Sequence, residues 1–160
     1  MNRIAKQTPP RQTGFSLIEM MIVIAIILII VSIAIPNFHK AQITAHQMAA
    51  MRTIAALQTA EAQYYTQYGE YAGSLAELGP PASGASGHAA ADLIPARLAA
   101  TGEASGYKFV IAPNHIGYTI SASPLAFGTT GERTFFSDQS LALHCHDGPE
   151  PASAADPEAK

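Results

Sequence analysis

An unbroken apolar run near the N-terminus constrains this chain more than any other feature. Residues 15–35, FSLIEMMIVIAIILIIVSIAI, contain a single charged side chain, that of Glu19. At about 1.5 Å per residue, a helix of this length crosses the roughly 30 Å hydrocarbon core of a bilayer. The alternative is a fully buried helix of a soluble protein, but the basic segment that precedes the run argues against it. The sequence therefore predicts a membrane-spanning helix.

The segment before this run has the charge of a cytoplasmic leader. Residues 1–14, MNRIAKQTPPRQTG, hold three basic residues, no acidic residue and two adjacent prolines. Positive residues stay on the cytoplasmic side, so the chain should cross the inner membrane once with its N-terminus in the cytoplasm. The whole chain has 9 basic and 12 acidic residues, so removal of the leader leaves a clearly acidic product. Such a product is a poor match for nucleic acid.

Glu19 is out of place at the start of the apolar run. An ionised carboxylate at the centre of a membrane helix costs about 2.5–3.5 kcal/mol on insertion scales. One hypothesis is that an opposite charge neutralises it. The alternative is that it snorkels to the cytoplasmic interface, which is only four residues away.

Good helix formers continue beyond Pro36, so we expect one helix from about 15 to 68. Pro36 has two interpretations: a kink where the helix leaves the membrane, or a point where the helix loosens during assembly. We assign residues 15–38 to the membrane and assembly half. The second half is amphipathic, with Arg52 and Gln63 opposite its apolar side. That apolar side comprises Ile43, Ala50, Ile54, Leu57, Tyr64, Tyr65 and Tyr68.

The remainder of the chain predicts a small antiparallel sheet. Gly69 is a plausible C-cap, residues 80–91 have the composition of a surface loop, and short helices or turns are expected on either side of that loop. From Tyr107 the apolar period changes from helical to alternating. Four strands in two hairpins follow, at 107–112, 117–123, 133–138 and 141–145.

One apolar face of such a sheet needs a cover, and the amphipathic half of the long helix is the obvious candidate. The fold class is therefore α+β, with a globular domain over residues 39–148. Residues 149–160, rich in Pro, Ala and acidic residues, are expected to be disordered.

Four consecutive side chains near the C-terminus are of types that can bind a metal. His144, Cys145, His146 and Asp147 suggest a metal, but on a strand the cysteine points away from the two histidines. Because Cys145 is the single cysteine, no intramolecular disulfide can form. We predict no metal and no cofactor, and the chain contains no catalytic triad or phosphate loop that would indicate an enzyme.

The tyrosines near the end of the long helix invite two interpretations, a stacking or electron-transfer surface or simple packing of the helix onto the sheet. We favour packing. Glu61, on the same helix face, is expected to border a partner surface. The tyrosines concerned are Tyr64, Tyr65, Tyr68 and Tyr71.

The stretch GFSLIE at residues 14–19, followed by the apolar span, resembles the class III signal of type IV pilins and pseudopilins. The resemblance extends through Pro36 and the long helix. AEAQYYTQYGEYAGSLAEL resembles the helix exit of bacterial pilins, and TGERTFFSDQSLALH the last hairpin of small pilin-like proteins. The chain departs from the family at Cys145, which cannot form the common C-terminal disulfide, so another device must hold the last strand.

The resemblance implies a pilin fold and a structural, self-assembling subunit. A prepilin peptidase would cut between Gly14 and Phe15 and methylate the new amine. Glu19 would then face the Phe15 amine of a neighbouring copy and set the step between subunits. The implied partners are further copies, minor pilins, the inner-membrane assembly platform and the membrane.

The family's filaments serve adhesion, twitching motility, DNA uptake or secretion, on the cell surface or as a periplasmic pseudopilus. One alternative is therefore a pseudopilin of a type II secretion or competence system. Another is a Sec-exported binding domain cleaved after Ser32-Ile-Ala34, whose mature form would begin at Ile35.

Overall fold

The computed structural model describes residues 14–159, which fall into two compact units divided after Phe38. Helix α1, Leu17–Tyr68, contributes to both units, and each unit is described by itself. The helix expected from about 15 to 68 is confirmed, and its backbone is helical through Pro36. The predictions for residues 1–13 of the leader lie outside the described residues.

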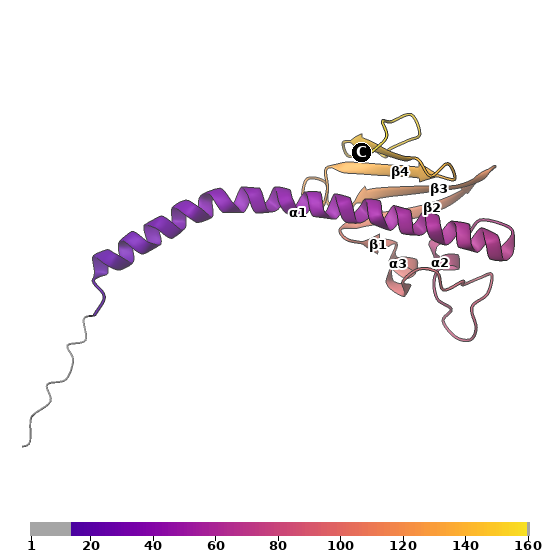
Figure 1. Cartoon of the computed structure of the whole chain (residues 1–160), viewed down its shortest axis with the longest axis horizontal. Coiled ribbons are helices and arrows are strands. Elements are labelled where there is room, and N and C mark those ends of the chain that lie inside the picture. Colours follow the sequence, from indigo (N-terminus) through magenta and orange to yellow (C-terminus); the bar gives the residue numbers. More distant parts are fainter. Residues whose placement is uncertain (1–13, 160) are drawn as a thin grey trace, which may run out of the picture. The chain divides into compact units, whose positions relative to one another are not determined.

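The second unit contains a five-stranded antiparallel sheet in the order β1-β2-β3-β4-β5 (Figure 1). The four predicted strands are confirmed, with small changes at their ends. The fifth, β1, is only two residues long, too short to display an alternating pattern. The strands are β1 (Glu103–Ala104), β2 (Tyr107–Asn114), β3 (Gly117–Pro124), β4 (Arg133–Asp138) and β5 (Leu143–Asp147).

The amphipathic half of α1 packs on one face of this sheet, as expected. Alternate residues of β2 and β3 are buried, which confirms the period-2 pattern. Burying each large apolar side chain contributes about 1.5–3 kcal/mol, so this one face supplies most of the unit's stability. The shared core includes Ile54, Leu57 and Tyr64 from α1, and Tyr107, Phe109, Tyr118, Ile120 and Phe135 from the strands.

Two short helices connect α1 to the sheet. Gly69 ends α1 with a φ of +79°, and its N–H donates to the Tyr65 carbonyl at 2.8 Å, so the predicted C-cap is confirmed. Helix α2 (Leu75–Leu78) and helix α3 (Ala96–Thr101) lie on either side of the predicted loop, whose residues 82–86 are exposed. The two helices agree with the prediction of short helices or turns on either side of this loop.

The C-terminal tail corrects the prediction of disorder for residues 149–160. The structure places residues 149–159 against β5, where the Cys145 N–H donates to the Pro157 carbonyl at 3.0 Å. The Ala159 N–H donates to the Leu143 carbonyl at 2.7 Å. Composition alone favoured disorder, but an edge strand leaves a row of unpaired backbone groups that the tail can satisfy.

Candidate functional site

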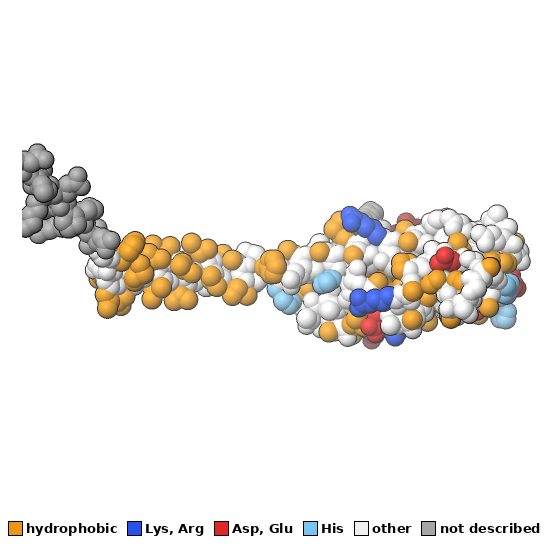
Figure 2. Space-filling model, turned by 90° about the horizontal axis from the view of Figure 1, so that it is seen from below, with side chains coloured by type: hydrophobic (Ala, Val, Ile, Leu, Met, Phe, Trp, Pro, Cys, Tyr) orange, Lys and Arg blue, Asp and Glu red, His pale blue; other side chains and the backbone are white. Residues whose placement is uncertain are grey.

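The N-terminal half of α1 presents an apolar surface to its surroundings. Every side chain from Phe15 to Ile35 is exposed within the described chain. Phe15 is 80% exposed and Leu17 is 77% exposed. Figure 2 shows hydrophobic side chains along this part of the helix. An exposed apolar surface of this extent marks a region that binds membrane or protein.

The same segment has an 18-residue window with a mean hydropathy of 3.1. By length and composition it can cross a membrane, although a cleaved signal sequence would pass the same test. A single carboxylate, that of Glu19, therefore sits among apolar groups that lack partners within the described chain.

Glu19 has a local role that the sequence interpretation missed. The Ser16 N–H donates to Glu19 Oε2 at 2.8 Å. Because α1 begins at Leu17, Ser16 is the N-cap residue and Glu19 the third residue of the helix. This is one half of a capping box, and the signal S-x-x-E was readable in the sequence. In a single copy, the carboxylate therefore stabilises the first turn of the helix.

The predicted cleavage position precedes this helix. Gly14, Phe15 and Ser16 have no regular secondary structure. A Cβ placed on Gly14 would have no heavy atom within 4 Å, so the backbone there is open to approach. The peptide bond between Gly14 and Phe15 is thus exposed and non-helical, as a peptidase substrate must be.

The tyrosines at the end of α1 pack as favoured in the sequence interpretation. Tyr64 is fully buried, and its hydroxyl donates to the His88 carbonyl at 2.6 Å. Tyr71 contacts Tyr118 of β3, with ring centroids 5.0 Å apart. Tyr65 does not join the buried face but stacks on Tyr71 at 4.7 Å. These contacts join the end of α1 to the sheet.

Glu61 does not lie at a partner surface, because its side chain is fully buried. Its Oε2 accepts from the Ala72 N–H at 2.9 Å, whereas its Oε1 has no hydrogen-bond partner among the described residues. Burial raises the pKa of Glu61 to about 7; the Ala72 N–H opposes this shift and the charge of Glu77 adds to it. Glu61 therefore fixes the turn after α1.

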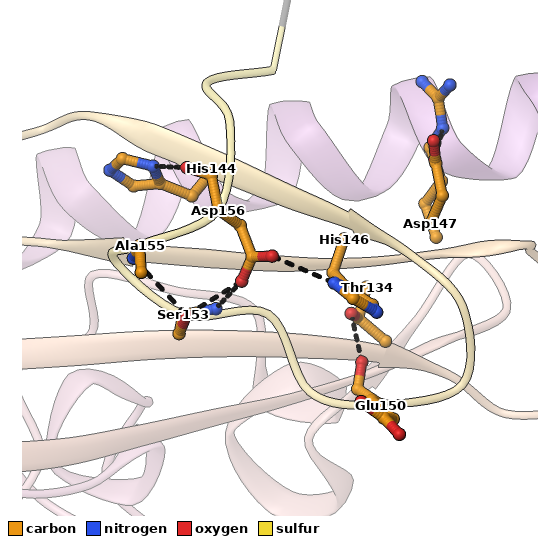
Figure 3. Close-up of polar contacts among 9 residues, drawn as sticks. Thr134, His144, His146, Asp147, Glu150, Ser153, Ala155 and Asp156 are labelled. Carbon is orange, nitrogen blue, oxygen red and sulfur yellow. Dashed lines mark hydrogen bonds and ion pairs between the residues drawn. The ribbon is translucent and has the colours of Figure 1, made fainter.

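The histidines of β5 bind the tail (Figure 3). His146 Nδ1 lies 2.9 Å from Asp156 Oδ1, and His144 Nδ1 lies 2.7 Å from the Asp156 carbonyl. Asp156 Oδ2 also accepts from the Ser153 N–H and hydroxyl at 2.7 and 2.8 Å. We call His144, His146, Ser153 and Asp156 the tail clasp.

The tail clasp, the packing of Cys145 and the ion pair between Asp147 and Arg133 account for the four residues that suggest a metal in the sequence. Cys145 is half-buried and packs against the core, on the opposite side of the strand from the histidines. Within residues 14–159, no group of three or more His, Cys, Asp or Glu residues is arranged to hold a metal ion. The sequence interpretation could not pair Asp156 with these histidines, because it treated the tail as disordered.

Comparison with known proteins bears on the N-terminal segment. A family model described as the prokaryotic N-terminal methylation motif matches residues 9–35. A curated relative, the type IV major pilin protein PilA of Myxococcus xanthus (strain DK1622), is 44% identical over 70 residues. The match covers 44% of this chain and 32% of that protein, so the chain spans about a third of the relative's length.

The fold, an apolar helix that continues into an amphipathic half packed on a small antiparallel sheet, is pilin-like. The family model and the relative confirm the resemblance of this chain to the type IV pilin family. The roles of Gly14, Phe15, Glu19 and Pro36 are taken up as proposals below.

Proposed function

We propose that this chain is a pilin-type filament subunit, cleaved between Gly14 and Phe15 and methylated at the new amine. Residues 1–14 are its leader, and residues 15–38 hold it in the inner membrane before assembly. The observation that carries the proposal is the fully exposed apolar surface from Phe15 to Ile35. In a filament, the same surface packs against helices of other copies, and dispersion and apolar burial drive assembly.

Cleavage changes the setting of Glu19. In the described chain its carboxylate accepts one hydrogen bond, from Ser16. A charged amine at Phe15 of a neighbouring copy is a stronger partner, because an ion pair satisfies two groups that are each costly in an apolar setting. Sliding one helix along the other breaks that pair, so it also sets the axial step. Pro36 supplies a point at which the helix can loosen, because proline donates no backbone hydrogen bond.

The N-terminus of the mature protein tests this proposal. We expect mass spectrometry of a sheared surface fraction to find a peptide that begins at methylated Phe15. A mature chain that begins at Ile35 would instead indicate a Sec-exported domain. A methylated chain that stays in the periplasm would indicate a pseudopilin of a secretion or competence system, which shares the processing but not the surface location.

Three variants test the role of Glu19. Glu19→Ala and Glu19→Lys should leave membrane insertion and cleavage intact but lower filament yield, because the neighbour's amine loses its partner. Glu19→Gln separates the two roles, since its amide oxygen can still accept from the Ser16 N–H but carries no charge. If Glu19→Gln assembles normally, the carboxylate serves only the helix cap and the ion pair is ruled out.

A further inference from the structure

A groove of about 430 Å³ in the second unit is not used by the function proposed above. It lies among three elements: α1, the start of α3 and β1. Its walls are largely apolar, and its rim carries two arginines. The residues that shape it include Arg52 and Ala56 from α1, Pro95, Arg97 and Leu98 around the start of α3, and Glu103 from β1.

The side chains that line this groove carry more positive than negative charge. Arg52 and Arg97 are exposed, and neither forms an ion pair within the described part of the chain. By contrast, Lys108 lies 3.8 Å from Glu103, and Arg133 lies 2.6 Å from Asp147. Glu103, the one carboxylate that lines the groove, is paired with Lys108. The two arginines therefore face solvent without an acidic partner among the described residues.

The opposite edge of the sheet carries the complementary charge. Strand β1 is one edge of the sheet, and β5 with the tail is the other. Glu132, Glu150 and Glu158, at this second edge, are exposed and form no ion pair among residues 14–159. The tail between the last two is built of small residues, mostly Ala and Pro. It therefore offers small apolar side chains flanked by carboxylates.

We call the groove with Arg52 and Arg97 the arginine groove, and the edge with Glu132, Glu150 and Glu158 the acidic tail edge. We propose that the arginine groove of one copy receives the acidic tail edge of a second copy in the filament. This inference rests on the proposed function. Two different patches are joined, so the contact is heterologous and can repeat from copy to copy without closing, as a filament requires. Because the mature chain is acidic, copies repel one another at most other orientations, and this pairing selects the register of the second units.

Charge reversal tests the contact in cells that carry the assembly machinery. Arg52→Glu combined with Arg97→Glu should lower the yield of sheared filaments by at least about tenfold, because like charges at an interface are strongly unfavourable. Glu150→Lys combined with Glu158→Lys should do the same. All four changes together should restore most of the yield. Lys40→Glu, a single charge reversal outside the groove, should leave the yield nearly unchanged.

Restoration by the fourfold variant also shows that each altered surface still folds. Normal yield in the double-arginine variant would overturn the groove's role. If both double variants lose filament yield and the fourfold variant does not restore it, the tail edge is not the occupant of the groove. A wild-type chain that forms no filament, although it is cleaved and methylated, would instead overturn the proposed function.

A cross-link reads the contact independently of yield. In a Cys145→Ser background, Ala56→Cys places a thiol in the groove and Ala154→Cys places one on the exposed tail. Mild oxidation should link the copies of a filament into a ladder of covalent oligomers. Either cysteine alone should give no more than dimers. Absence of the ladder while filaments are present would overturn the proposal.

Discussion

At the scale of single residues, the buried carboxyl of Glu61 makes stability depend on pH. Its pKa is raised by burial from 4.5 to about 7, so between these values the folded state binds a proton that the unfolded state releases. The contribution of Glu61 to stability is therefore greatest below about pH 4.5, and it is lost as the pH rises through 7, a decrease of roughly 3 kcal/mol. Urea unfolding in mild detergent at several pH values would measure the slope.

The matched variant is Glu61→Gln, which keeps an acceptor for the Ala72 N–H but does not titrate. We expect its unfolding free energy to vary less with pH between 5 and 8 than that of the wild type. The rest of the sequence is the same in both proteins, so other effects of pH cancel in the comparison. Identical slopes in the two proteins would show that Glu61 is ionised when folded.

At the scale of elements, the tail clasp does for β5 what a disulfide cannot do in a chain with one cysteine. The bond from His146 and the two bonds from Ser153 lower the pKa of Asp156 to about 2, and the bond to Asp156 raises the pKa of His146. The Asp156 contribution is present above about pH 4 and is lost as the pH falls towards 2. The His146 contribution is full below about pH 6.5 and is lost as the pH rises through its raised pKa.

Hydrogen exchange measures how firmly the tail clasp holds the tail. Pairing of the tail with β5 should protect the backbone amides of Cys145 and Ala159 from exchange. Asp156→Asn should reduce their protection near pH 5, where both charges are present in the wild type. Glu150→Gln removes an equal charge from the tail without breaking a side-chain bond, so protection should be kept. Equal protection in all three proteins would mean that backbone pairing alone holds the tail.

The elements also show what could be predicted from the sequence. An apolar run followed by an amphipathic pattern identified α1, and alternating apolar residues identified β2 and β3. Two short segments on either side of a turn identified β4 and β5. Strand β1 was missed because two residues carry no period, and the tail because its order depends on Asp156 meeting a distant histidine. The burial of Glu61 was missed for a similar reason: the turn that brings the Ala72 N–H to it is tertiary. Only the Ser16–Glu19 cap was local and could have been read in advance.

At the scale of the whole molecule, the two units differ in what they need from their surroundings. The first exposes apolar side chains from Phe15 to Ile35, whereas the second encloses its own core. Since a unit with its own core can fold alone, we expect residues 39–160 to be a soluble monomer without detergent. Sedimentation would give its mass, and near-ultraviolet circular dichroism would report fixed packing of the buried tyrosines.

The matched control for this fragment is the full mature chain, which should remain in detergent or membrane. A fragment that is soluble but lacks a near-ultraviolet signal or unfolds without cooperativity would contradict the division after Phe38. The core would then depend on the apolar helix. A monomer that unfolds cooperatively would mean that the second unit is already folded before assembly. A variant in residues 15–38 that lowers filament yield would then act on assembly and not on the folding of the second unit.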